Sequence, residues 1–196
     1  DYIEKNIYNG ILAQQHPNTG MVAYFLPMAS GFTKGGEKGW GHPTNDFYCC
    51  HGTLVQAHVR YTENIYYEDA QGLVVSQYIP SELKWQKNNI PITIEQHFLG
   101  SEYNKDFDAS RWNMKFKISA NQDSQFEIKF RVPSWLKENP LVKINGVKQN
   151  VLVSNGSFIL NKTWKNDDVS IEFPTKVYLE PLAKNSNLYA FMEGPI

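Results

Sequence analysis

The stretch Trp112-Asn-Met-Lys-Phe-Lys-Ile-Ser119 is followed, after a short polar gap, by Gln125-Phe-Glu-Ile-Lys-Phe-Arg-Val132. In both stretches every second residue is apolar, and the residues between them are charged or polar. This period of two is typical of a β-strand with one buried face. We therefore predict a strand in each stretch, with Met114, Phe116 and Ile118 turned to the same side of the first.

The chain between Ile65 and Pro174 carries the same signal repeatedly. Further strands are predicted at 65–68, 73–79, 92–98, 142–144, 157–160 and 169–173. Asn145-Gly146 is a strong signal for a type I′ hairpin, and Asn155-Gly156 is another. Eight short strands at this spacing predict a β-sandwich over residues 66–174.

The two ends of the chain have a different character. Residues 1–65 combine a helical opening around Ile3 and Ile7 with a run at 53–64 that has apolar residues and no helix breaker, so we predict a short helix there. Residues 175–196 hold two more strand-like runs, 177–179 and 188–192. We therefore expect a mainly β chain, cut from a longer protein, that ends in the start of a second β domain.

Composition limits the partners of the protein. The chain has 19 basic and 20 acidic residues and no basic run, which argues against a nucleic acid or an anionic membrane as a partner. No apolar run approaches the roughly 18–20 residues of a membrane span. Aromatic residues make up 14% of the sequence. That share is explained mostly by strand propensity, although proteins that handle carbohydrates are also rich in aromatic residues.

The only two cysteines, Cys49 and Cys50, are adjacent in sequence. They cannot form an ordinary structural disulfide, because the bridge needs Cα atoms about 4.4–6.8 Å apart and one peptide link spans about 3.8 Å. Two packed thiols, half of a metal site, or a nucleophile with a neighbour remain open. The predicted helix at 53–64 would place both thiols just before a helix N-terminus, where exposed N–H groups favour a thiolate.

Several motifs in order resemble glycoside hydrolase family 127, the family of β-L-arabinofuranosidases. The resemblance begins at Phe47-Tyr-Cys-Cys-His-Gly-Thr53 and continues through Asn64-Ile-Tyr-Tyr-Glu-Asp-Ala-Gln-Gly-Leu-Val-Val75. It extends through Phe130-Arg-Val-Pro-Ser-Trp135 and Val142-Lys-Ile-Asn-Gly146 to Leu188-Tyr-Ala-Phe-Met-Glu-Gly-Pro195. The ordered set, which covers nearly the whole chain, is far more specific than any one motif.

The resemblance implies an (α/α)₆ barrel followed by β-sandwich domains. Residues 1–65 would be the last part of the barrel, residues 66–174 a complete sandwich, and residues 175–196 the start of a second one. It also implies a zinc ion held by a glutamate and three cysteines, with Cys49 as the nucleophile and a zinc contact and Cys50 as a zinc ligand. The expected activity is retaining hydrolysis of β-L-arabinofuranosides or related sugars.

Two parts of the implied site are absent from this sequence. The remaining glutamate and cysteine ligands, and the acid/base glutamate, are expected upstream in the missing N-terminal part of the barrel. We therefore expect this chain to be inactive alone. Roles for His42 and His51, as donors to a sugar hydroxyl or as structural residues, stay open.

Two other functions are compatible with the sequence. The first is a non-catalytic carbohydrate-binding or structural sandwich in which the cysteines are remnants or a structural metal site. The second is a redox pair that forms a strained disulfide between neighbours. The sequence assigns no compartment.

Overall fold

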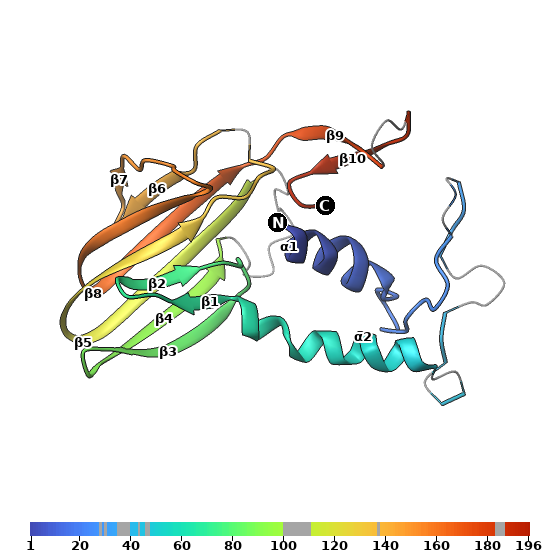
Figure 1. Ribbon diagram of the computed structural model, residues 1–196, viewed down its shortest axis with the longest axis horizontal. Coiled ribbons are helices and arrows are strands. Elements are labelled where there is room, and N and C mark those ends of the chain that lie inside the picture. Colours follow the sequence, from blue (N-terminus) through green and yellow to red (C-terminus); the bar gives the residue numbers. More distant parts are fainter. Residues whose placement is uncertain are drawn as a thin grey trace. The chain divides into compact units, whose positions relative to one another are not determined.

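The computed structural model describes residues 1–27, 29, 31–34, 40–42, 44–45, 48–99, 111–136, 138–182 and 187–196. The chain divides into two compact units (Figure 1). One consists of Asp1–Glu63 with Pro195–Ile196, and the other of Asn64–Gly194. None of the helices in the described part of the chain has the length and apolar character that crossing a bilayer requires.

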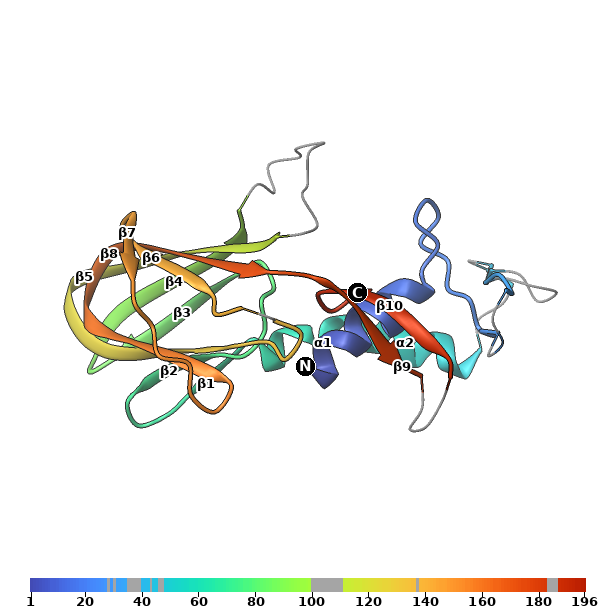
Figure 2. The same cartoon turned by 90° about the horizontal axis from the view of Figure 1, so that it is seen from above.

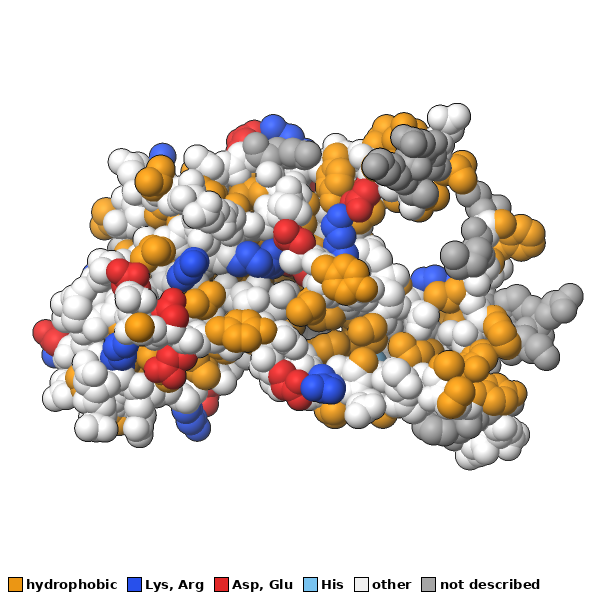
Figure 3. All heavy atoms as spheres, viewed as in Figure 1, with side chains coloured by type: hydrophobic (Ala, Val, Ile, Leu, Met, Phe, Trp, Pro, Cys, Tyr) orange, Lys and Arg blue, Asp and Glu red, His pale blue; other side chains and the backbone are white. Residues whose placement is uncertain are grey.

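The first unit is helical. Helix α1 (Tyr2–Asn6) continues into a π-helical turn at Ile7–Ile11 and a 3₁₀ turn at Leu12–Gln14, and helix α2 spans Cys49–Val59. Hydrophobic side chains, orange in Figure 3, lie at the surface over α2, where Val55 and Val59 are exposed. A helix with apolar residues on its exposed side is typical of an element that packs inside a larger domain.

Helix α2 begins four residues earlier than the sequence indicated, so the expected bounds 53–64 are wrong. Its first turn is closed by two hydrogen bonds. The backbone N–H of Tyr48 donates to Nδ1 of His51 (3.0 Å), and the N–H of His51 donates to the Tyr48 carbonyl (3.0 Å). The α-helix ends at Val59, and a 3₁₀ turn at Tyr61–Asn64 replaces the predicted last turn. Cys49 and Cys50 are therefore inside the first turn of the helix, not before it.

The second unit is built mainly of strands. The chain order is β1 (Tyr66–Glu68), β2 (Gly72–Val75), β3 (Ser81–Lys87), β4 (Ile90–Phe98), β5 (Arg111–Arg131), β6 (Leu141–Ile144), β7 (Val147–Gln149) and β8 (Ser157–Pro174). Strands β9 (Val177–Pro181) and β10 (Tyr189–Glu193) form a separate antiparallel pair. This mainly β architecture confirms the fold class expected from the periodicity.

Two long strands, β5 and β8, form both layers of the sandwich. They pair antiparallel from Arg111–Pro174 to Arg131–Ser157. The first half of β5 also pairs with β4, which pairs with β3, and the second half pairs with β2, which pairs with β1. The β6–β7 hairpin extends the first layer from the last part of β8. Figure 2 shows the two long strands curving together at one end of the sandwich.

Strand β5 is sharply bent, as the distance between two of its own side chains shows. The rings of Phe116 and Phe130 have their centroids 5.1 Å apart. Fourteen residues of straight strand would separate them by about 46 Å, so the strand folds over the core. Between the pairs Ser119–Asn166 and Ser124–Trp164, β5 advances five positions and β8 only two. This bulge supplies the extra length on one strand that sharp bending requires. The predicted breaks at 120–124 and 161–168 are therefore wrong: each pair of expected strands is a single strand.

The predicted alternation is confirmed in the core. Met114, Phe116 and Ile118 are fully buried, and Phe130 from the other half of β5 stacks on Phe158 with ring centroids 5.1 Å apart. The buried indole of Trp164 donates from Nε1 to the Phe126 carbonyl (2.9 Å), which satisfies its one polar group.

The hairpin signals correspond to left-handed turns. Asn145 and Gly146 have φ values of 50° and 81°, and Asn155 and Gly156 have 49° and 67°, as a type I′ turn requires. Strand β3 was not predicted, because its exposed charged residues mask the inward pair Leu83 and Trp85. The turn that follows it, at Asn88–Asn89, has φ values of 51° and 64° and was the missed signal.

One glycine is required by a close approach between strands. β2 and β5 pair in parallel, with Gly72 opposite Glu127. A Cβ on Gly72 would lie 2.1 Å from the backbone oxygen of Glu127. Asp69 fixes the chain entering this strand, because its Oδ1 accepts hydrogen bonds from the N–H groups of Gln71 (3.0 Å) and Gly72 (2.9 Å).

A buried carboxylate ties the β6–β7 turn to β8. Oδ1 of Asp167 accepts from Nζ of Lys162 (2.6 Å) and Nδ2 of Asn145 (2.7 Å), and Oδ2 accepts from the Lys165 N–H (3.1 Å). Burial alone would raise the pKa of Asp167. The hydrogen bonds from Lys162, Lys165 and Asn145 outweigh that effect and hold the pKa below its ordinary value.

Candidate functional site

The start of helix α2 places the two thiols side by side. Cys49 and Cys50 are exposed and unbridged, and their Sγ atoms are 3.8 Å apart. Both belong to the first turn of the helix, where backbone N–H groups have no partner within the helix and the dipole favours negative charge. Asp46 and Phe47, which precede them in the motif, lie outside the described residues. The local fold therefore favours thiolate at this position.

Tyr24 adds a hydroxyl to the sulfur pair. Its Oη lies 3.5 Å from Sγ of Cys50 and 4.0 Å from Sγ of Cys49. The hydrogen bonds with Cys50 and Cys49 raise the pKa of Tyr24 to about 12. The pKa of Cys49 is lowered, chiefly by its hydrogen bond with Cys50 and next by that with Tyr24.

Three aromatic rings hold the ring of Tyr24. Phe25, Tyr48 and His51 meet it edge-on, with ring centroids 4.7, 5.1 and 5.4 Å away. Its ring could pack in a core or stack on a sugar face. The structure instead directs its hydroxyl to both sulfurs. A residue 25 positions before Cys49 carries no local signal of that contact.

The histidines near the motif have structural contacts. His51 is buried, and its Nδ1 accepts the Tyr48 N–H that begins α2. His42 is exposed, and its Nδ1 lies 3.2 Å from the Thr44 N–H and 3.0 Å from the Thr44 hydroxyl. These contacts assign His51 to the helix start and His42 to a turn.

His58, farther along α2, is held at both ring nitrogens. The Gln15 amide nitrogen donates to Nε2 (3.0 Å), because an amide NH₂ has only donors to offer. Nδ1 then carries the proton and donates to the Tyr61 hydroxyl (3.1 Å). His58 is therefore a fixed packing residue.

The sulfur pair has the spacing of half a tetrahedral metal site. Two Zn–S bonds of about 2.3 Å that meet at the tetrahedral angle place their sulfurs about 3.8 Å apart. The observed Sγ–Sγ distance is also 3.8 Å. Within the described residues, no third His, Cys, Asp or Glu joins the pair. Cys49 and Cys50 thus fit two of the four positions around a zinc ion.

Comparison with known protein families identifies the family to which this chain belongs. The model of the β-L-arabinofuranosidase GH127 catalytic domain matches residues 1–63, and that of the GH127 middle domain matches residues 72–175. The second match covers more than half of the sequence. The chain belongs to glycoside hydrolase family 127, as the ordered motifs indicated.

Three solved structures with the same fold are described as glycosidases, and two of them as GH127 enzymes. The GH127 β-L-arabinofuranosidase of Geobacillus stearothermophilus T6 is 22% identical, with a TM-score of 0.63, over 76% of this chain and 23% of its own. A GH127 β-arabinofuranosidase is 18% identical, with a TM-score of 0.74, over 99% of this chain and 32% of its own. A structure described as a glycoside hydrolase is 17% identical, with a TM-score of 0.75, over 98% of this chain and 32% of its own.

The similarity to these structures is limited in length and in sequence identity. The chain spans a third or less of the length of each of the three structures, and at these identities the likeness shows the fold alone. No curated protein sequence matches the chain.

Proposed function

We propose that the protein containing this chain is a retaining glycoside hydrolase that acts on β-L-arabinofuranosides or related sugars. In this proposal Cys49 is the nucleophile and a zinc contact, and Cys50 is a zinc ligand. The observation that carries it is the exposed sulfur pair at the start of α2, in the segment that matches the family's catalytic domain.

Cysteine replaces the carboxylate that most retaining glycosidases use as nucleophile. A free thiol has a pKa of about 8.5 and is mostly protonated at neutral pH. In this chain the hydrogen bonds with Cys50 and Tyr24 lower the pKa of Cys49, so more of it is ionised. Zinc, when bound, supplies positive charge that holds coordinated sulfur as thiolate.

The reaction proceeds in two displacements. The Cys49 thiolate attacks the anomeric carbon, the C–S bond forms, and the glycosidic C–O bond breaks as the leaving oxygen takes a proton from the upstream acid. Water then attacks the same carbon, gives its proton to the same group as base, and the C–S bond breaks to restore the thiolate. Two inversions give net retention. Tyr24 keeps its proton because its pKa is about 12, so its hydroxyl is available to donate to the Cys49 thiolate.

The test uses the full-length protein with its upstream segment. Cys49→Ser is expected to lower hydrolysis of an aryl β-L-arabinofuranoside by about 10³-fold or more, and Cys50→Ser is expected to lose bound zinc, measured by elemental analysis. Gln56→Ala, an exposed change on the same helix, is the matched control and should leave both unchanged. Acid quenching during turnover should trap one sugar on Cys49, seen by peptide mass spectrometry.

Two results would overturn the proposal. The first is full hydrolysis by Cys49→Ser together with an absence of zinc in the wild-type protein. The second is an inverted product by NMR. Because the other expected ligands and the acid/base group are upstream, the 196-residue chain alone is expected to show no turnover.

A further inference from the structure

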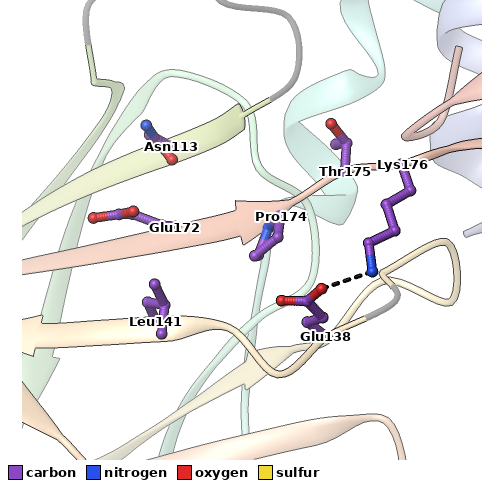
Figure 4. Close-up of a pocket in the computed structure, with 7 residues that line it drawn as sticks. All are labelled: Asn113, Glu138, Leu141, Glu172, Pro174, Thr175 and Lys176. Carbon is purple, nitrogen blue, oxygen red and sulfur yellow. Dashed lines mark ion pairs between the residues drawn. The ribbon is translucent and has the colours of Figure 1, made fainter.

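The sandwich carries a cavity of about 420 Å³ on its outer surface. Asn113, Glu172 and Leu141 line it from three neighbouring strands, β5, β8 and β6 (Figure 4). Glu172 is the register partner of both Asn113 and Leu141, so the three side chains form one row across the sheet. Their sequence neighbours Met114, Ile171 and Val142 are buried, which places the row on the face away from the core.

The end of the cavity is closed by two other segments. Pro174 is the last residue of β8, Thr175 and Lys176 follow it, and Glu138 precedes β6. Figure 4 shows Glu138 and Lys176 pointing toward each other, and their charged atoms are 2.6 Å apart. The volume is within the range of about 300–1,000 Å³ that is usual for small-molecule sites.

The charges around the cavity cancel. Glu138 is paired with Lys176, and Glu172 is paired with Lys143 at 3.6 Å. Each carboxylate is held in position by a cation and still has lone pairs to accept hydrogen bonds. The pair with Lys176 lowers the pKa of Glu138, so this acceptor is ionised at neutral pH. A balanced site of this kind suits a neutral ligand better than a free cation or anion.

The remaining lining groups suit a ligand with both hydroxyl and C–H surfaces. Leu141 is 43% exposed and Pro174 also lines the cavity, so both offer apolar surface to a ligand. Asn113 adds an amide whose Oδ1 is buried and has no hydrogen-bond partner among the described residues. The Lys176 ammonium group adds donors. A sugar hydroxyl both donates and accepts, so a mixed set of this kind can satisfy several at once.

We propose that this cavity is a second, non-catalytic binding site for a neutral sugar unit of an oligosaccharide. The carboxylates of Glu138 and Glu172 accept hydrogen bonds from its hydroxyls, and Leu141 and Pro174 contact its ring carbons. The site is separate from the cysteine pair and does not depend on the proposed hydrolysis. Its effect would be to hold a polymeric substrate on the enzyme.

The test is oligosaccharide binding measured by titration calorimetry and NMR on the full-length protein carrying Cys49→Ser, so that no substrate is consumed. The probes are neutral arabino-, xylo- and cello-oligosaccharides of six units, with polygalacturonate and spermine as charged comparisons. Glu172→Gln and Glu138→Gln are each expected to weaken binding of the best neutral probe about tenfold or more. Leu141→Arg, at an exposed position, should block the site without opening the core.

Glu82→Gln is the matched control, because Glu82 is also paired with a lysine (Lys84, 3.3 Å) but lies on β3. It should leave binding unchanged. Three outcomes would overturn the proposal: no neutral probe shifts the NMR signals of the residues that line the cavity at millimolar concentration, those shifts survive Glu172→Gln and Leu141→Arg together, or a charged probe shifts them in preference. None of these bears on hydrolysis at Cys49, so failure here is distinguishable from failure of the proposed function.

Discussion

Replacing Asp167 with Asn tests whether the buried carboxylate stabilises the sandwich. Asp167 is 7% exposed and accepts three hydrogen bonds, one of them from a lysine. Asn has one acceptor oxygen and one donor NH₂, so at least one bond is lost and an N–H then faces a donor. Hydrogen bonds to charged groups contribute about 1.5–3 kcal/mol each. We expect Asp167→Asn to lower the free energy of unfolding by about 2–4 kcal/mol. The measurement is urea unfolding monitored by tryptophan fluorescence.

The pH dependence gives a second readout. The folded pKa of Asp167 is below its unfolded value of about 3.9, so its stabilisation is complete above that range and is lost as pH falls through the folded pKa. The stability difference between wild type and variant should therefore shrink below about pH 4. Asp168→Asn is the control, because Asp168 is exposed and forms a surface pair with Lys115 (3.1 Å), which is worth about 1 kcal/mol at most. Equal stability of Asp167→Asn and wild type at pH 7, or a difference constant to pH 3, would refute the reasoning.

Three further substitutions follow from the packing. Gly72→Ala is expected to cost about 1–3 kcal/mol of unfolding free energy, because the new Cβ would lie 2.1 Å from the Glu127 carbonyl oxygen. Phe130→Ala is expected to cost about 3–5 kcal/mol, since its ring is fully buried between other aromatic rings. Tyr24→Phe removes a hydrogen bond that lowers the pKa of Cys49, so the pH midpoint of thiol alkylation at Cys49 should move upward.

Each of these has a comparison within the chain. Gly146→Ala meets no atom within 4 Å, so its cost should come from its φ of 81° alone. Ile159→Ala changes an exposed side chain on β8 and should cost far less than Phe130→Ala. Tyr61→Phe removes a hydroxyl that contacts His58 and not the sulfurs, so the alkylation profile should not move. Equal losses of unfolding free energy within either of the first two pairs, or equal shifts of the alkylation midpoint in the third, would contradict the explanation.

The period-two pattern predicted most of the strands correctly, because each of those strands has one buried face. It could not show that β5 and β8 run through their polar middles, since a bulged bend has no apolar alternation of its own. Strand β3 was missed for a related reason: an edge strand with charged outward residues resembles a loop in composition. An alternating sequence pattern shows which residues of a strand are buried. At a bend or an edge strand fewer residues are buried, so the pattern no longer predicts the backbone conformation.

The candidate site was also predicted only in part from the sequence. The cysteine pair, a helix next to it and the family followed from sequence, but the pair lies inside the first turn of that helix and not before it. Tyr24 did not, because its contact with the sulfurs depends on the path of the chain between residues 24 and 49. His51 was left open between chemistry and structure, and only its hydrogen bond to the Tyr48 N–H assigns it to the helix start.

The shared ribbon of β5 and β8 has a consequence for how the sandwich assembles. Arg131 and Ser157 are the paired residues nearest in sequence, and Arg111 and Pro174 the most distant. Extending the ladder from the first pair costs little, because each doubling of a loop adds only about 0.6 kcal/mol of closure entropy. We expect the ribbon to zip from Arg131 toward Arg111, so that one layer forms first and the second grows from it around the bend. In pulsed hydrogen exchange the amides near Ile128 should then be protected before those near Met114, and the reverse order would exclude this route.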